Sequence, residues 1–142
     1  MDKVTIHQDI YTYHIDFAGH VSNIVYIQWM EIGRLKLLEA VGMPVAELSR
    51  DNHTFPTLVE TRISYKKPLF LGDRVRIEIW LSRLKNVTAI MEFRFYNTAG
   101  ELTTTGRQTG LFVNGNSHKP HRISREQRAA FSVYLETGPE EQ

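Results

Sequence analysis

The segment 24–41 constrains the fold most, because it is a long helical pattern that is apolar on more than one side. At about 100° per residue, one arc of this helix is wholly apolar. That arc contains Tyr26, Trp29, Met30, Gly33, Leu37, Ala40 and Val41. On the other side, Ile24, Ile27, Ile32, Leu35 and Leu38 stand among Gln28, Glu31, Arg34, Lys36 and Glu39. A helix of this kind needs cover on several sides.

Residues at both ends bound this helix. Ser22 or Asn23 can cap its start by accepting a hydrogen bond from one of the first free amides. Gly42 and Pro44, which are residue types that end helices, follow Val41. We therefore expect the helix to end near residue 41.

Apolar and β-branched residues in strand-like patterns predict a sheet around the helix. Five patterns occur, at residues 4–13, 59–66, 75–81, 87–96 and 101–113. Pro56 falls in the loop before the second pattern, and Gly72 with Asp73 forms a turn after it. Ser124 and Gln127 have the capping-box spacing of a short C-terminal helix. The sequence therefore predicts an α+β fold in which a five-stranded antiparallel sheet wraps one long central helix.

Two of these patterns also predict which side chains point inward. In the second pattern the inward set is Val59, Thr61, Ile63 and Tyr65. In the third pattern it is Val75, Ile77, Ile79 and Leu81, with Arg74, Arg76, Glu78 and Trp80 on the wet face.

Length and composition limit the classes of function. A chain of 142 residues with 42% hydrophobic residues predicts a single domain over 1–142. A formal net charge of +1 does not favour nucleic acid as a partner, and the absence of cysteine excludes disulfides and a thiol nucleophile. Since no apolar run suits a signal peptide or a membrane span, we expect a cytoplasmic protein.

Several well-known chemistries lack their motifs in this sequence. There is no G-x-S-x-G elbow, no phosphate-binding glycine loop, no G-x-G-x-x-G turn and no H-E-x-x-H pair. His118 and His121 form an H-x-x-H pair without an evident third ligand, whereas zinc needs three or four ligands. We therefore expect neither a metal nor a cofactor.

The loop before the long helix carries the candidate site. Asp16, His20, Ser22 and Asn23 lie close together between an apolar strand and an apolar helix, where polar groups are costly unless they are bonded or functional. The first amides of the helix are unpaired within it and carry partial positive charge, so they can hold an oxyanion. A carboxylate beside them would supply the base or nucleophile for acyl transfer.

A purely structural interpretation of the same residues also stands. Asp16 can bond loop amides, Asn23 can act as a cap, and His20 can be a satisfied residue under the loop. Spacing alone does not decide between the two interpretations.

Two stretches resemble the 4-hydroxybenzoyl-CoA thioesterase family of hot-dog-fold proteins. Residues 15–31, IDFAGHVSNIVYIQWME, are similar to its signature of an aspartate, a Gly-His-Val turn, an asparagine and an aromatic-rich helix. Residues 63–75, ISYKKPLFLGDRV, are similar to its strand, proline and Gly-Asp turn. The first stretch also resembles the helix start of plant-type acyl-ACP thioesterases.

This resemblance implies an acyl-CoA thioesterase that assembles as a homodimer or homotetramer with its site at the dimer interface. Asp16 would attack the thioester or activate water, and the amides near Ile24 and Val25 would hold the oxyanion. Where several bacterial members have histidine or tyrosine, this chain has Asn23, which orients water or donates a hydrogen bond but is no acid or base. His20 would orient Asp16 or line the site.

The residues expected around the substrate are mainly aromatic and basic. An apolar acyl pocket could be lined by Tyr26, Trp29, Met30, Phe55 and Tyr65. The CoA phosphates could meet Arg62, Lys66, Lys67, Arg74, Arg83 or Lys85. Glu31 and Glu60 are weaker candidates for a second carboxylate, because each fits a solvated face.

Three other functions remain open for this sequence. An acyl-ACP thioesterase is the nearest, and a non-catalytic acyl-CoA-binding protein of the same fold is the second. A hot-dog dehydratase is the third, although it needs an acid and a base, which Asn23 disfavours.

Overall fold

The computed structural model describes residues 1–136, so the part of the predicted single domain at 137–142 lies outside the described residues. The helices are α1 (Asn23–Ala40), the short α2 (Val45–Glu47) and α3 (Arg125–Ser132). The long strands are β1 (Val4–Asp9), β2 (Thr54–Tyr65), β3 (Arg74–Leu84), β4 (Thr88–Tyr96) and β5 (Leu102–Asn114). Smaller elements are β6 (Pro120–His121), a 3₁₀ turn (Thr12–His14) and a π turn (Leu48–Asn52).

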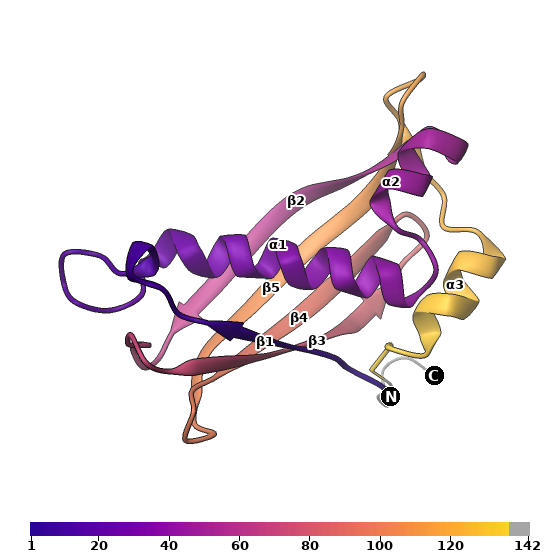
Figure 1. Cartoon of the computed structure of the whole chain (residues 1–142). Helices are drawn as coiled ribbons and strands as arrows, with labels where there is room; N and C mark the ends of the chain where they lie inside the picture. Colours follow the sequence, from indigo (N-terminus) through magenta and orange to yellow (C-terminus); the bar gives the residue numbers. More distant parts are fainter. Residues whose placement is uncertain (137–142) are drawn as a thin grey trace.

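The long strands form one antiparallel sheet in the order β1-β3-β4-β5-β2, and β6 pairs with β5. Helix α1 runs across one face of this sheet, with β2 along one side and α3 beyond the end of α1 (Figure 1). The predicted α+β arrangement of one long helix against a five-stranded sheet is confirmed.

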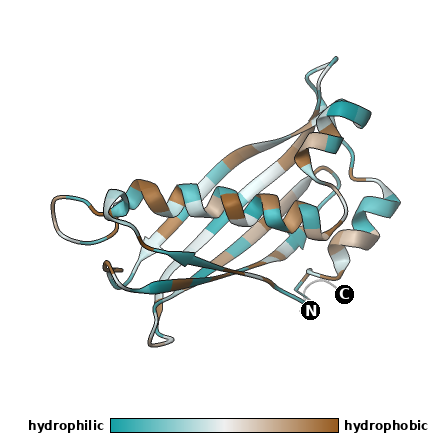
Figure 2. Ribbon diagram, in the orientation of Figure 1, coloured by the Kyte–Doolittle hydropathy of each residue, from teal (hydrophilic) through white to brown (hydrophobic). Residues whose placement is uncertain are grey.

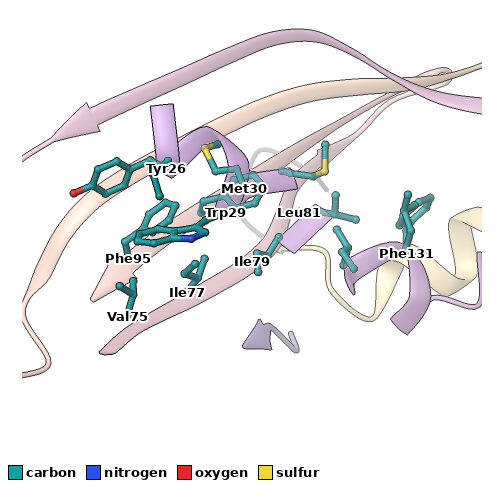
Figure 3. Close-up of a cluster of buried hydrophobic side chains, with 14 of the residues drawn as sticks. Tyr26, Trp29, Met30, Val75, Ile77, Ile79, Leu81, Phe95 and Phe131 are labelled. Atoms are coloured by element: carbon teal, nitrogen blue, oxygen red, sulfur yellow. The ribbon is translucent and has the colours of Figure 1, made fainter. Parts of the chain in front are cut away.

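The core lies between α1 and the sheet (Figure 3). The inward residues predicted for β3 are all fully buried: Val75, Ile77, Ile79 and Leu81. From α1, Trp29 and Met30 enter the same core, and Phe93 and Phe95 come from β4. Burial of these large apolar side chains is the main source of stability, at roughly 1.5–3 kcal/mol for each.

Two glycines let the helix approach the sheet closely. A Cβ on Gly33 of α1 would lie 2.9 Å from Cδ1 of Ile79, and a Cβ on Gly106 of β5 would lie 2.8 Å from Cε of Met30. Both separations are shorter than carbon atoms tolerate, so a larger residue at either position would require the side chain of Ile79 or Met30 to move.

The burial of α1 follows the predicted apolar arc with changes at one end. Five residues of the predicted arc are buried as expected: Tyr26, Trp29, Met30, Gly33 and Leu37. Val25 and Leu38, which lie outside the predicted arc, are also buried. The prediction was wrong for Ala40, which is exposed at the last turn of the helix.

The second apolar side of α1 is not covered within the described chain. Ile24, Ile27, Ile32 and Leu35 remain 66%, 46%, 40% and 38% exposed. Apolar segments recur along the whole of α1 (Figure 2). Strand β2, next to this helix, also exposes Phe55, Leu58 and Val59.

Three predictions about the strands were wrong. Pro56 lies inside β2, paired with Phe112, because an edge strand tolerates a residue without an N–H. The first strand stops at Asp9, where a 3₁₀ turn soon follows. Trp80 is buried because Lys3 and Arg94 lie over its ring and its Nε1 donates to Glu136.

The alternation predicted for β2 holds only after a bulge. The pairing register with β5 shifts between Leu58 and Glu60, so Val59 is 63% exposed instead of pointing inward. Thr61 and Ile63 are partly buried, and Tyr65 is 45% exposed at the end of the strand.

Among residues 1–136, no helix is long and apolar enough to span a membrane.

Candidate active site

A tight loop holds the carboxylate of the candidate site. A bridge between Ile15 and Val21 closes the loop, and the Asp16 amide donates to the His20 carbonyl at 3.0 Å. Gly19 turns the chain at a φ of +85°, a conformation that disfavours other residues. The Val21 amide donates to the Leu69 carbonyl at 2.9 Å, which anchors the base of the loop.

The side chain of Asp16 is fixed by one hydrogen bond. Its Oδ1 accepts the Ala18 amide at 2.9 Å, and the residue is only partly buried. This bond confirms the structural interpretation, in which Asp16 bonds a loop amide, but it occupies one oxygen only. Within residues 1–136 no donor binds Oδ2, so that oxygen is free to take a proton or attack a carbonyl carbon.

The start of α1 leaves amides that can bind an anion. Ser22 is the N-cap, but its side chain makes no capping bond, and Asn23 is already the first helical residue. The Val25 amide is occupied, because it donates to the Ser22 carbonyl at 3.0 Å. Over the described part of the chain, the Asn23 and Ile24 amides have no backbone acceptor, which makes them the available donors.

A hollow of about 220 Å³ opens at this end of α1. Its lining is His20, Val21, Asn23, Tyr26, Tyr65, Lys66, Lys67 and Pro68. Asp16 is not part of the lining, but its charge is one of the influences on the Tyr26 hydroxyl. Burial is the main cause that raises the pKa of Tyr26, and the charges of Tyr65 and Asp16 raise it further.

Two tyrosines connect this hollow to the sheet. Their rings meet edge to face, with the centroids of Tyr26 and Tyr65 5.1 Å apart, and Tyr26 packs in the same way on Phe95 at 5.5 Å. The Tyr65 hydroxyl donates to the Asn23 carbonyl at 3.2 Å. Burial also raises the pKa of Tyr65, so both hydroxyls stay protonated near neutral pH.

Comparison with known proteins identifies the family. The model of the thioesterase-like superfamily matches residues 10–131. The chain belongs to this superfamily. It is 30% identical over 105 residues to the Bacillus subtilis protein named "Putative acyl-CoA thioesterase YneP", covering 74% of this chain and 75% of that one.

Solved structures of thioesterases share the fold of this superfamily member. The DHNA-CoA thioesterase from Staphylococcus aureus superposes with a TM-score of 0.86 at 21% identity, covering 94% of this chain and 91% of that one. The gentisyl-coenzyme A thioesterase BH1999 superposes with a TM-score of 0.81 at 26% identity, covering 90% of this chain and 99% of that one. The predicted hot-dog fold is confirmed, and the chain is a thioester hydrolase.

The aromatic and basic residues expected near the substrate of this thioesterase occupy different places. Trp29 and Met30 are 2% and 0% exposed, so they belong to the core and not to the hollow. Lys67 lies 2.6 Å from Glu101, while Lys66 has no carboxylate partner within residues 1–136. Lys85 lies at the β3–β4 turn, where Arg128 of α3 donates to its carbonyl, far from the hollow.

The two weaker carboxylate candidates of the thioesterase are paired on its surface. Glu31 pairs with Arg34, and Glu60 pairs with Arg62, both at about 3 Å. Glu31 and Glu60 are exposed, as expected for solvated faces. Across the described residues, no three histidine, aspartate or glutamate side chains gather as metal ligands.

A second hollow lies between the other half of α1 and the sheet. It is lined almost wholly by apolar side chains, among them Leu37, Leu38, Pro56, Leu111 and Phe131. It lies toward the Pro56 end of β2, whereas the hollow near Asp16 lies at the Tyr65 end. Within one chain, the two hollows are therefore at opposite ends of β2.

Sequence reasoning missed a histidine that supports the loop of the thioesterase. His14 is 5% exposed, and its Nδ1 accepts the Tyr11 amide at 2.9 Å. Its ring meets Trp29 edge to face at 5.3 Å, and its carbonyl accepts the Ser22 amide. A histidine two residues before Asp16 was the available signal, but its sequence position alone does not show burial.

We expect His14 to make stability depend on pH. Burial lowers its pKa below 6.5, so the unfolded chain binds the proton more readily than the folded chain. The neutral, buried His14 therefore contributes fully to the free energy of unfolding above pH 6.5. This stability is lost as the pH falls from 6.5 through the pKa of His14 in the folded protein, by about 1.4 kcal/mol for each unit by which folding lowers that pKa. Urea unfolding on both sides of pH 6.5 measures it.

The His14→Phe variant isolates this effect, since it removes the titrating group. Its free energy of unfolding should fall less steeply below pH 6.5 than that of the unaltered protein. His118→Gln, at an exposed histidine, is the control and should keep the original slope. An unchanged slope in His14→Phe would show that another group causes the pH dependence.

Proposed function

We propose that this thioester hydrolase cleaves acyl-CoA to the free acid and CoA, with Asp16 at the centre of the chemistry. The single observation that supports this is a carboxylate in the loop that leads into α1, held through one oxygen while the other has no donor among residues 1–136. Asp16 delivers the oxygen that attacks the thioester carbon. That oxygen is its own, or it belongs to a water molecule from which Asp16 takes a proton.

The start of the helix supplies the complementary charge. As the carbonyl oxygen becomes negative, the Ile24 amide donates to it, and the positive end of α1 lowers the energy of the tetrahedral intermediate. The C–S bond then breaks and CoA leaves as a thiolate, which takes up the proton that Asp16 removed from water. If Asp16 itself attacks, the C–S bond breaks to leave an anhydride between Asp16 and the acyl group, and water hydrolyses this anhydride to release the free acid. In this proposal the Asn23 side chain orients water or substrate at the hollow. The carbonyl of His20 accepts a hydrogen bond from the Asp16 amide and so keeps Asp16 in place.

A panel of thioesters tests the proposed function. Purified protein is assayed with short-chain, long-chain and aromatic acyl-CoAs, and with acyl-ACP in parallel, by detecting the released thiol. The chain has no cysteine, so every thiol detected in the acyl-CoA assay comes from substrate. Preference for acyl-ACP would favour the alternative acyl-ACP thioesterase, and tight binding without turnover would favour a non-catalytic acyl-CoA-binding protein.

Lys66 is the proposed contact for the CoA phosphates. Lys66 is exposed beside the hollow and has no carboxylate partner among residues 1–136. Lys66→Ala should therefore raise KM for acyl-CoA about two- to five-fold with little change in kcat. The effect should shrink at high salt, which screens exposed charges. Lys85→Ala is the control, since it removes an exposed lysine just after the last residue of β3, away from the hollow. Equal KM changes in both variants would contradict the assignment.

The uncovered surfaces support a homodimer as the unit of this proposed cytoplasmic enzyme, with a homotetramer as the larger assembly. Ile27, Ile32 and Leu35 of α1 and the free edge of β2 form one apolar side. Antiparallel pairing of two β2 edges would bring the Tyr65 end of one strand near the Pro56 end of the other. The hollow at the start of α1 in one copy would then adjoin the apolar hollow of its partner. Sedimentation equilibrium measures this assembly.

A further inference from the structure

The hydroxyl of Tyr65 contacts the peptide unit that carries the free amide of the proposed site. Tyr65 is the last residue of β2, and its hydroxyl donates to the carbonyl of Asn23 at 3.2 Å. That carbonyl and the Ile24 N–H belong to the same peptide group. The hydrogen bond therefore reaches the Ile24 amide through a single planar unit.

A donor on the carbonyl changes what the N–H of that peptide can do. Hydrogen bonds in a chain polarise one another, by about 10–30% for each bond. The bond from Tyr65 draws electron density toward the Asn23 oxygen, which makes the Ile24 N–H a stronger donor to an oxyanion. It also links the first turn of α1 to the sheet, so the amide keeps its direction when the substrate arrives.

The surroundings of Tyr65 suit this task. Its ring meets Tyr26 edge to face with the centroids 5.1 Å apart, and Tyr26 is itself buried against Phe95. This packing limits rotation of the phenol ring. Because the pKa of Tyr65 is raised by burial, its hydroxyl remains a donor through the neutral pH range.

We propose that Tyr65 is a positioning residue, which strengthens and orients the Ile24 amide as the oxyanion donor of this thioesterase. The inference rests on the proposed function, since it needs the oxyanion to form at the start of α1. Tyr65 acts through the Asn23 peptide and does not itself touch the reacting atoms.

The Tyr65→Phe variant tests the inference, because it removes the hydroxyl and keeps the ring against Tyr26. An oxyanion donor is worth about 10²–10³ in kcat, so the loss of roughly 10–30% of its strength predicts a fall in kcat of about two- to eight-fold. KM should stay unchanged, because the ground-state carbonyl binds the donor weakly. Tyr96→Phe, at a tyrosine on the far face of the sheet under Arg76, is the matched control and should leave kcat unchanged.

A second measurement is independent of activity. In an amide NMR spectrum, Tyr65→Phe should move the nitrogen resonance of Ile24, since the bond on the preceding carbonyl is lost while the ring stays. Tyr96→Phe should not move it. An unchanged Ile24 resonance would overturn the inference even if the protein is an active thioesterase, and so would an increase in KM with constant kcat. A protein that lacks thioesterase activity but shows the shift would instead overturn the proposed function.

Discussion

Asp16→Asn should lower kcat for acyl-CoA hydrolysis by about 10²–10⁴-fold, the range expected when a catalytic base is removed. In the unaltered protein, the Ala18 amide donates to Oδ1 of Asp16 at 2.9 Å. The side-chain oxygen of asparagine can accept the same hydrogen bond, so the loop should retain its shape. The thermal midpoint should therefore change little, and KM should stay within a few-fold. Steady-state kinetics by thiol release and a melting curve measure both effects.

Asp73→Asn is the matched control for this change. Asp73 also uses a carboxylate oxygen to accept a loop amide, that of Phe70 at 3.1 Å, but it is not part of the proposed chemistry. Its kcat should equal that of the unaltered protein. Full activity in Asp16→Asn would remove Asp16 from the mechanism, and equal losses in both variants would point to damaged loops instead of lost chemistry.

Phe93→Ala should lower the free energy of unfolding by about 3–5 kcal/mol, as for other large aromatic side chains removed from a core. Phe93 is 1% exposed, and its side chain lies next to both Gly33 and Gly106, at which helix and sheet meet. Neither Gly33 nor Gly106 has a side chain that could move into the space, so a cavity should remain. Urea unfolding of the unaltered and substituted proteins measures the difference.

Phe17→Ala provides the control with the same chemical change. Phe17 is fully exposed at the loop before α1, so its removal should change stability by no more than about 0.5 kcal/mol. A loss below about 1 kcal/mol for Phe93→Ala would show that the core collapses around the vacancy.

The fold was predictable from the sequence wherever one periodicity determines burial. The alternation at Val75, Ile77 and Ile79 and the arc around Trp29 both describe surfaces that face one core, and both are buried as expected. The prediction failed where burial depends on a distant segment. Trp80 is covered by residues from both ends of the described chain, and no local pattern contains that information.

The order of loop and helix at the candidate site was predictable from the sequence, but its hydrogen bonds were not. The loop around Asp16 and the start of α1 lie together, because they are adjacent in sequence. The spacing could not show that the Val25 amide is used within the first turn, which leaves the Asn23 and Ile24 amides as donors within the described chain. The contact of Tyr65 with Asn23 joins residues far apart in the chain and depends on the pairing of β2 with β5.

The close approach of α1 to the sheet determines where a long substrate can go. At Gly33 and Gly106 the side chains of Ile79 and Met30 fill the space between the helix and the sheet. In the proposed mechanism, a fatty chain that starts at Asp16 would have to displace these core side chains to pass beneath the helix, so we expect it to leave sideways across β2. If the proposed dimer forms at β2, we expect chain-length selection to depend on the partner subunit more than on the depth of this chain's own interior.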